Sequence, residues 1–272
     1  MKILNKQILC ECQGNKIVNM KIECPHIAKK AKPGQFVSLM VSENGERIPL
    51  TIVDHDNNSI DVIFQVLGLS TQLLEKLEVG DNLYAIVGPL GKATHIEKFG
   101  NVILVAGGVG IAEIDPVAKA FKEIGNYVEI VIGTKNKELL FSDKELGEIA
   151  DKLFICTDDG SIGEKCFTTD ILEKQLKLKK YDLVYTVGPI VMMEKVVSIT
   201  KSSKIKTMVS LNSLMLDGTG MCGCCRVSIS GKPKFTCIDG PEFDGFEVNW
   251  QELKKRNDMY CDKENHVCKL RG

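Results

Sequence analysis

A glycine-rich stretch in the last quarter of the sequence carries the residues with the clearest chemical use. It reads Asp217-Gly-Thr-Gly-Met-Cys222-Gly-Cys-Cys225, and Cys237 follows after eleven further residues. Plant-type [2Fe–2S] sites use the spacing C-x4-C-x2-C followed by a distant cysteine. The spacing here is D-x4-C-x2-C-x11-C, so we predict a two-iron cluster held by one carboxylate and three thiolates. The predicted ligands are Asp217, Cys222, Cys225 and Cys237.

Two other uses of these cysteines stay open. One is a zinc knuckle, although structural zinc sites usually carry paired C-x2-C knuckles and this loop has only one. The other is a group of free structural thiols. Cys224 competes with Cys225 for the third ligand position, and the C-x2-C offset from Cys222 favours Cys225.

Composition limits the class of protein. The 272 residues include 35 Lys plus Arg and 36 Asp plus Glu, for a net charge of −1. These charges are scattered, so we expect no nucleic-acid partner and no membrane surface. Eleven cysteines, an odd number, with no apolar signal segment after Met1 argue against a disulfide framework and favour a cytoplasmic protein. The longest apolar stretch, residues 102–112, is too short to span a bilayer.

The first third of the sequence reads as β-structure. Short runs rich in β-branched residues are separated by turn signals such as Lys32-Pro33-Gly34, which is typical of strands. Six such runs predict a small closed antiparallel barrel. A helical stretch over residues 70–77 precedes the last strand. The predicted strands are residues 7–12, 16–24, 36–41, 48–53, 60–66 and 82–87.

Three short motifs in this barrel have the residue types of a ligand site. The first places a cation and a hydroxyl at a strand start, the second puts hydroxyls at a helix N-terminus, which favours phosphate, and the third offers a permissive backbone. Each alone is also typical of a solvated turn, and their order makes the set informative. The residues are Arg47, Pro49, Leu50 and Thr51; Gly68, Ser70 and Thr71; and Gly88 and Gly91.

The middle third alternates strand and helix patterns, which predicts an open parallel sheet that binds ligands beyond the carboxyl ends of its strands. The strands are predicted over 101–106, 127–132, 153–156, 183–187 and 207–211. The G-G-x-G turn after the first strand is a degenerate form of a pyrophosphate-binding loop. For the methionines after the fourth strand, helix packing is the alternative. The candidate nucleotide residues are Gly107, Gly108, Gly110, Asp158, Gly188, Pro189 and Met192.

The order of these motifs resembles the ferredoxin-NADP⁺ reductase superfamily, from the first strand to about Lys255. Within it, the sequence is most similar to the cluster-bearing branch. This branch contains the electron-transfer subunit of dihydroorotate dehydrogenase and the small, NAD-side subunit of NADH-dependent reduced ferredoxin:NADP⁺ oxidoreductase, also known as a sulfide dehydrogenase subunit. Dihydroorotate enzymes carry cysteine at the first ligand position, so Asp217 resembles the second group.

The resemblance implies four regions: an antiparallel six-stranded FAD-binding barrel (1–96), a Rossmann-like NAD-binding domain (97–209), a [2Fe–2S] region (210–247) and a charged tail (248–272). It places Thr51 near the flavin N5 and Arg47 on the FAD pyrophosphate. No side-chain acid or nucleophile is needed, because the chemistry belongs to the cofactors. NAD(H) is favoured over NADP(H) by the resemblance alone.

The implied function is electron transfer between NAD(H) and a larger flavoprotein partner with further iron–sulfur clusters, in a heterodimer or larger assembly. Electron bifurcation would link this complex indirectly to ferredoxin. Three alternatives stay open: the electron-transfer subunit of dihydroorotate dehydrogenase, a stand-alone NAD(P)H-dependent sulfide or ferredoxin reductase, and a redox sensor with vestigial nucleotide sites.

Two departures from the superfamily pattern concern charged residues. Arg47 lies four residues before Thr51, where the family spacing is three, so we expect it to approach the phosphates from a different angle. Glu113 and Asp115 follow the nucleotide loop, where carboxylates would repel a pyrophosphate, and we expect both on the outward face of a helix. In the tail, Cys261, His266 and Cys268 suggest either metal or partner binding or a plain surface extension.

Overall fold

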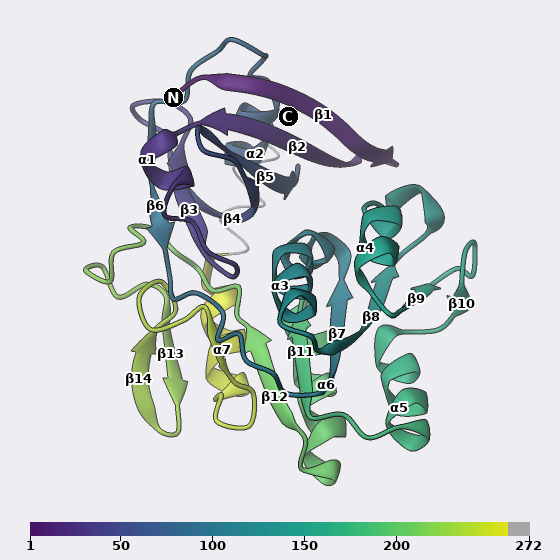
Figure 1. The fold of residues 1–272 in the computed structure, drawn as a ribbon. Coiled ribbons are helices and arrows are strands. Elements are labelled where there is room, and N and C mark those ends of the chain that lie inside the picture. Colours follow the sequence, from purple (N-terminus) through teal and green to yellow (C-terminus); the bar gives the residue numbers. More distant parts are fainter. Residues whose placement is uncertain (261–272) are drawn as a thin grey trace. The chain divides into compact units, whose positions relative to one another are not determined.

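The computed structural model describes residues 1–260 (Figure 1). The chain forms two compact units. The first consists of Met1–Ala93, Ser213–Pro241 and the described residues from Asn249 on. The second consists of Thr94–Asn212 and Glu242–Val248. The first unit therefore combines the N-terminal strands with the cysteine-rich loop, and the second holds the alternating strands and helices.

The N-terminal part of the first unit is a six-stranded antiparallel sheet, as predicted, with strand order β1-β2-β5-β4-β3-β6. Lys2 forms a bridge with Asn82, and the Ile3 amide donates to the Asp81 carbonyl at 2.9 Å, so the segment before β6 closes the sheet onto β1. The elements are β1 (Ile3–Cys12), β2 (Asn15–Glu23), α1 (Pro25–Ala28), β3 (Phe36–Met40), β4 (Arg47–His55), β5 (Ser59–Gln65), α2 (Leu69–Glu75) and β6 (Ala85–Leu90).

Alternating apolar residues build the core of this sheet. In β2 and β5, every second side chain is buried, because successive residues of a strand point to opposite faces. Burying one such side chain stabilises the fold by about 1.5–3 kcal/mol. The register places Val18 opposite Phe64, Met20 opposite Val62 and Ile22 opposite Ile60.

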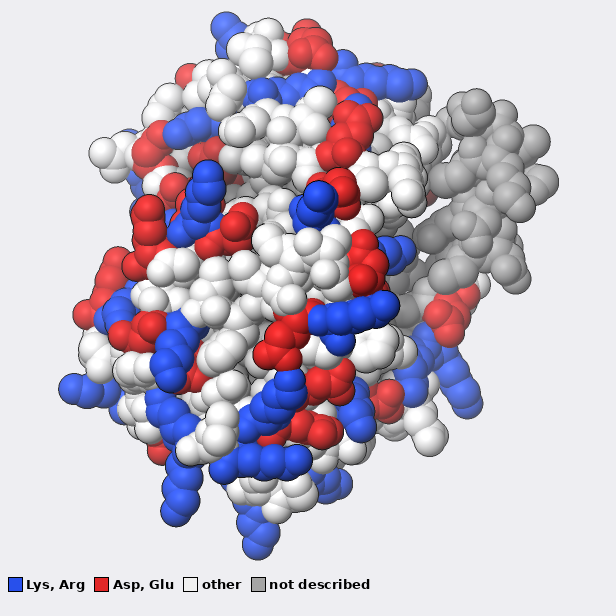
Figure 2. Space-filling view, turned by 90° about the vertical axis from the view of Figure 1, so that its right-hand side faces the viewer, with Lys and Arg blue, Asp and Glu red and all other residues white. Residues whose placement is uncertain are grey.

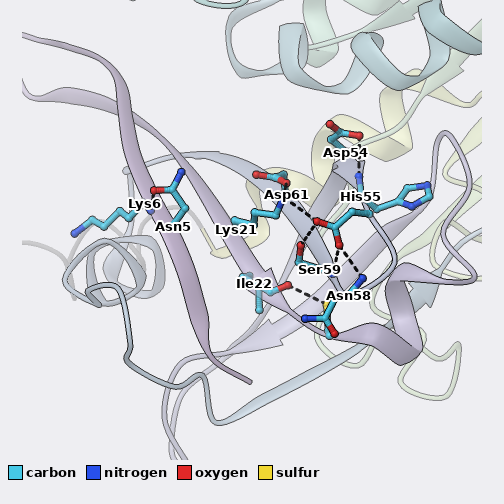
Figure 3. Close-up of polar contacts among 11 residues, drawn as sticks. Asn5, Lys6, Lys21, Ile22, Asp54, His55, Asn58, Ser59 and Asp61 are labelled. Atoms are coloured by element: carbon cyan, nitrogen blue, oxygen red, sulfur yellow. Dashed lines mark hydrogen bonds and ion pairs between the residues drawn. The ribbon is translucent and has the colours of Figure 1, made fainter.

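The turn between β4 and β5 is organised by one carboxylate. Asp56 accepts hydrogen bonds from the Asn58 amide at 2.7 Å and from the Ser59 amide and hydroxyl, both at 2.8 Å. Lys21 adds an ion pair at 3.0 Å, and Figure 3 shows how Lys21, Asn58 and Ser59 gather at this turn. The Asn58 amide, followed by the other donors, lowers the pKa of Asp56, so the carboxylate is ionised at neutral pH.

Replacing Asp56 with alanine is expected to lower the melting temperature at pH 7, because the turn loses all of these bonds. A carboxyl group whose folded-state pKa is lowered adds stability above its unfolded pKa of about 3.9, and this contribution is lost as the pH falls through the folded-state value. The difference between wild type and Asp56→Ala should therefore shrink in acid. Urea denaturation across this range measures it.

Asp54→Ala is the matched control, because within residues 1–260 the Asp54 carboxylate accepts a single hydrogen bond, from the neighbouring His55 amide at 2.8 Å. Equal stability of the two variants at pH 7 would contradict the assignment of Asp56 as the organising residue of the turn.

The second unit is built on a seven-stranded sheet of order β10-β9-β8-β7-β11-β12-β15, in which only β15 is antiparallel to its neighbour. From β7 the chain continues to β8 and β9 on one side of β7. It then crosses to β11 and β12 on the other side of β7. The strand order thus reverses between β7 and β11, which is where such sheets bind ligands. The strands are β7 (Asn101–Gly107), β8 (Tyr127–Thr134), β9 (Lys152–Thr157), β10 (Glu164–Lys165), β11 (Leu183–Val187), β12 (Lys206–Ser210) and β15 (Glu242–Asp244).

Helices pack against this sheet and bury its central strands. Ile103 and Val105 of β7 pack with Ile171 of α5 and Val196 of α6. Residues 102–106 are all fully buried, as the continuous apolar run predicts. The helices are η1 (Gly108–Gly110), α3 (Ile111–Glu123), η2 (Lys137–Leu139), α4 (Asp143–Ile149), α5 (Thr168–Leu178) and α6 (Ile190–Ser203).

The C-terminal part of the first unit contains the cysteine-rich loop, a hairpin of β13 (Arg226–Ile229) and β14 (Lys232–Phe235), and the helices α7 (Trp250–Asn257) and η3 (Asp258–Tyr260). The tail residues Cys261, His266 and Cys268 lie outside the described residues.

Over residues 1–260, no helix is both long and apolar enough to cross a membrane. On the face drawn in Figure 2, Lys and Arg are interspersed with Asp and Glu, without an extended patch of one sign.

Candidate functional site

Two of the four predicted cluster ligands meet in a small buried core of the first unit. The sulfur atoms of Cys225 and Cys237 lie 3.2 Å apart, and each residue is only 1% exposed. Burial raises the pKa of the Cys237 thiol to about 12, so the Cys237 thiol stays protonated unless a cation compensates for its charge. Their apolar surroundings are Phe36, Met215, Leu90 and Phe235.

The loop before Cys225 turns its amide groups toward the thiols. The Gly220 amide contacts the Cys237 thiol, and the Cys224 amide contacts the exposed Cys222 thiol and lowers its pKa. Gly220 has a φ of +86°, and a Cβ there would lie 2.7 Å from the Ile238 side chain. Only glycine fits such a position. Amide donors around thiols suit thiolates and bound sulfides.

Asp217, the predicted carboxylate ligand, lies on the same loop and is ionised. Its Oδ2 atom accepts a hydrogen bond from the Thr219 amide at 3.0 Å and another from the Thr219 hydroxyl. The hydroxyl makes the largest contribution to lowering the pKa of Asp217. The Arg47 guanidinium lies 3.7 Å from Oδ1, so a barrel residue reaches the loop within the first unit.

A two-iron cluster and a single metal ion make different demands on the ligands of this loop. Across residues 1–260, no three His, Cys, Asp or Glu side chains converge on one point as a single metal site requires. A structural zinc ion takes four ligands around one centre, whereas a [2Fe–2S] cluster divides its ligands between two irons. The close pair of Cys225 and Cys237 fits one iron, and the four-residue ligand set stays a prediction.

The first and third barrel motifs lie on either side of β3. Thr51 of β4 and Leu90 of β6 both pair with Phe36. The β4 residues 47–51 and all of β6 are half-buried, whereas Phe36 and its neighbour Val37 are buried. A strip of half-exposed apolar residues beside a hydroxyl fits a flat aromatic ring. These residues therefore fit a flavin, and the individual contacts stay predictions.

The hydroxyls of the second barrel motif already have protein partners. The Thr71 hydroxyl accepts from the Leu67 and Gly68 amides at 3.0 and 3.1 Å and so caps α2. The Ser70 hydroxyl donates to Glu46 at 3.1 Å. The expected phosphate contacts of Ser70 and Thr71 thus stay predictions.

In the second unit, the predicted nucleotide residues of the loops after β7 and β11 meet where the strand order reverses, and Asp158 lies apart, after β9. A Cβ at Gly107 would lie 2.7 Å from the Met192 sulfur, and a Cβ at Gly188 would lie 2.9 Å from the Gly107 carbonyl oxygen. The loops after β7 and β11 therefore touch. Asp158 is exposed at the end of β9, and its amide donates to the Thr134 carbonyl at 3.2 Å. All of these residues lie at the carboxyl edge of the sheet, where a dinucleotide would bind.

Known proteins carry the same combination of elements. Residues 212–249 match the iron–sulfur cluster binding domain of dihydroorotate dehydrogenase B. Over 245 residues, the chain is 45% identical to the dihydroorotate dehydrogenase B (NAD⁺) electron transfer subunit homolog of Thermotoga maritima, covering 89% of this chain and 86% of the relative. The chain belongs to the family of these electron-transfer subunits.

Solved structures agree with this family. The chain resembles a chain in a structure of NADH-dependent reduced ferredoxin-NADP oxidoreductase, with 41% identity, a TM-score of 0.93 and coverage of 99% of this chain and 96% of that one. A ferredoxin-NADP⁺ reductase from Plasmodium falciparum, 19% identical with a TM-score of 0.61, covers 74% of this chain and 89% of its own. The likeness to the Plasmodium falciparum protein shows only that the two chains share a fold.

The structure shows contacts around the site that the sequence alone did not predict. Arg256 of α7 donates to the Cys224 carbonyl at 2.9 Å and so fixes the cluster loop. Glu113, expected on the outward face of the helix, is half-buried, and burial, followed by the nearby Glu242 and Glu113, raises the pKa of the Tyr185 phenol. Asp115 instead pairs with Lys119 at 2.6 Å along the helix.

A half-buried carboxylate of β15, Glu242, makes stability depend on pH. Glu242 accepts hydrogen bonds from Thr94 at 2.5 Å and Tyr185 at 2.8 Å, yet burial raises its pKa. A raised folded-state pKa means that the stability from this group is full below the unfolded pKa of about 4.3 and is lost as the pH rises through the folded value. Wild type should lose stability relative to Glu242→Gln as the pH rises.

Urea denaturation of both proteins from about pH 4 to about pH 8 measures this difference. Glutamine keeps an oxygen that accepts from Tyr185 and Thr94 and cannot ionise. Parallel stability curves for wild type and Glu242→Gln would contradict the prediction.

Proposed function

We propose that this chain is the electron-transfer subunit of a cytoplasmic oxidoreductase that passes electrons between NAD(H) and a larger flavoprotein partner through FAD and a [2Fe–2S] cluster. The likeness to a chain in a structure of NADH-dependent reduced ferredoxin-NADP oxidoreductase carries the proposal, because it extends over 99% of this chain. Hydride and single-electron chemistry belong to the bound cofactors. The chain binds them, orients them and sets their potentials.

The barrel would hold FAD against the half-buried strip of β4 and β6, with the Thr51 hydroxyl beside the reactive edge of the ring. The loop of residues 217–237 would hold the cluster with Asp217, Cys222, Cys225 and Cys237. In the second unit, the Gly107–Gly110 turn would bind the pyrophosphate of NAD(H) through its amides. The contact between Met192 and Gly107 supports a shared site at the carboxyl edge of the sheet.

Among enzymes of this kind, we favour a heteromeric NADH-dependent ferredoxin:NADP⁺ oxidoreductase that works by electron bifurcation. The supporting feature is the carboxylate at the first ligand position. The second candidate is the electron-transfer subunit of dihydroorotate dehydrogenase, which the name of the Thermotoga maritima relative supports.

Anaerobic purification of the tagged chain from its source organism distinguishes the candidates. We expect a larger subunit with flavin and further iron–sulfur clusters, and a complex that reduces NADP⁺ with NADH only when reduced ferredoxin is also supplied. Oxidation of dihydroorotate by the complex would favour the second candidate. A chain that purifies without a partner and acts alone on a sulfur compound would contradict both.

A further inference from the structure

Arg47 points at the cluster loop. It is the first residue of β4, and its guanidinium lies 3.7 Å from Oδ1 of Asp217, with both side chains partly exposed. In the superfamily pattern the flavin-binding arginine lies three residues before the hydroxyl residue, and here Ile48 occupies that position. The departure in spacing therefore coincides with a different partner for Arg47.

Thr219 holds the other oxygen of the same carboxylate. Its amide and hydroxyl both donate to Oδ2 of Asp217, the amide at 3.0 Å. The turn between them requires glycine, because Gly218 has a φ of +84° and a Cβ there would lie 2.9 Å from the Leu90 side chain. The carboxylate is thus oriented from two sides, by a loop donor and by a barrel cation.

We propose that Thr219 and Arg47 are positioning residues for Asp217 and that they raise the reduction potential of the cluster that Asp217 helps to bind. This inference rests on the proposed function. Reduction adds a negative charge to the cluster, and hydrogen-bond donors and cations at a ligand stabilise the more negative state. A hydrogen-bond donor to the oxygen atoms of a carboxylate ligand therefore raises the reduction potential of the cluster, as a donor to a cluster sulfur does.

The test is an EPR-monitored redox titration of the full chain reconstituted with FAD, iron and sulfide. Thr219→Val keeps the size of the side chain and removes its hydroxyl. We expect it to shift the one-electron equilibrium of the cluster about tenfold toward the oxidised form, which is about 59 mV. Thr219→Ser restores the hydroxyl and should return the potential to the wild-type value.

Arg47→Gln should lower the potential by less, because the ion pair is partly exposed, and its effect should shrink as salt is added. The Thr219→Val shift should not depend on salt. Ser230→Ala, in the turn between β13 and β14, removes an exposed hydroxyl elsewhere in the same region and should leave the potential unchanged.

Unchanged potentials in both Thr219→Val and Arg47→Gln would overturn the inference. Asp217→Ala, measured alongside, separates this failure from that of the ligand assignment. If Asp217→Ala changes the EPR spectrum while the other two variants do not, only the positioning roles fall. If Asp217→Ala also behaves like wild type, Asp217 is not a ligand and the inference falls with that assignment. A wild-type chain that takes up no cluster would refute the proposed function itself.

Discussion

Replacing Cys225 with serine is expected to abolish cluster binding, so that iron falls from about two atoms per reconstituted chain to background. The Cys225 sulfur is buried and lies 3.2 Å from the Cys237 sulfur, and serine offers a hydroxyl that seldom ionises. Iron and sulfide analysis, with EPR of the dithionite-reduced protein, measures the loss. Flavin content should stay near the wild-type level, because the ladders that pair β3 with β4 and β6 do not involve this thiol.

Cys224→Ser provides the matched control, since it removes the adjacent thiol of the same loop. The Cys224 side chain is half-exposed and not paired with Cys237, so its loss should leave the cluster intact. A full cluster in Cys225→Ser, or loss of the cluster only in Cys224→Ser, would show that the third ligand has been assigned to the wrong cysteine.

Replacing Gly110 with alanine is expected to weaken NADH binding by at least about tenfold, or about 1.4 kcal/mol. A Cβ there would lie 2.9 Å from the Val187 carbonyl oxygen and 3.1 Å from the Gly188 Cα. These are backbone atoms, so the start of α3 must move away from the end of β11, at a cost of about 1–3 kcal/mol. Titration with NADH measures the affinity, and reduction by dithionite should be unaffected.

Gly147→Ala is the control for this variant. It lies within α4, and a Cβ there would make only an ordinary contact of 3.7 Å with Leu153. Alanine in a helix is favoured over glycine by about 0.5–1 kcal/mol, so this protein should be at least as stable as wild type. NADH affinity in Gly110→Ala equal to that of the control would contradict the placement of the nucleotide at this turn.

Local patterns predicted the elements of the fold, and long-range pairing decided their ends. The last barrel strand was predicted over residues 82–87, but β6 runs from Ala85 to Leu90 and includes Pro89, which lies between the motif residues Gly88 and Gly91. Proline is tolerated there because β6 lies at the end of the strand order, where one side needs no donor. The preceding residue Asn82 instead bridges to Lys2, and no local pattern shows that pairing.

The same distinction applies to the candidate site. The predicted cluster ligands were readable because their spacing lies almost entirely within one loop, and the bond between Thr219 and Asp217 is equally local. The ion pair from Arg47 to Asp217 and the hydrogen bond from Tyr185 to Glu242 join distant segments. Their residue types fit many surface and core roles, so only the folded chain shows these contacts.

The most direct test of the central claim is an anaerobic titration of the reconstituted chain with NADH and, separately, NADPH. Flavin absorbance and the EPR signal of the reduced cluster are followed together. We predict that NADH bleaches the flavin and produces the cluster signal, while NADPH reacts slowly or not at all. A flavin that NADH reduces without any [2Fe–2S] signal would contradict the assignment of the loop from Asp217 to Cys237, and with it the proposed path of the electrons.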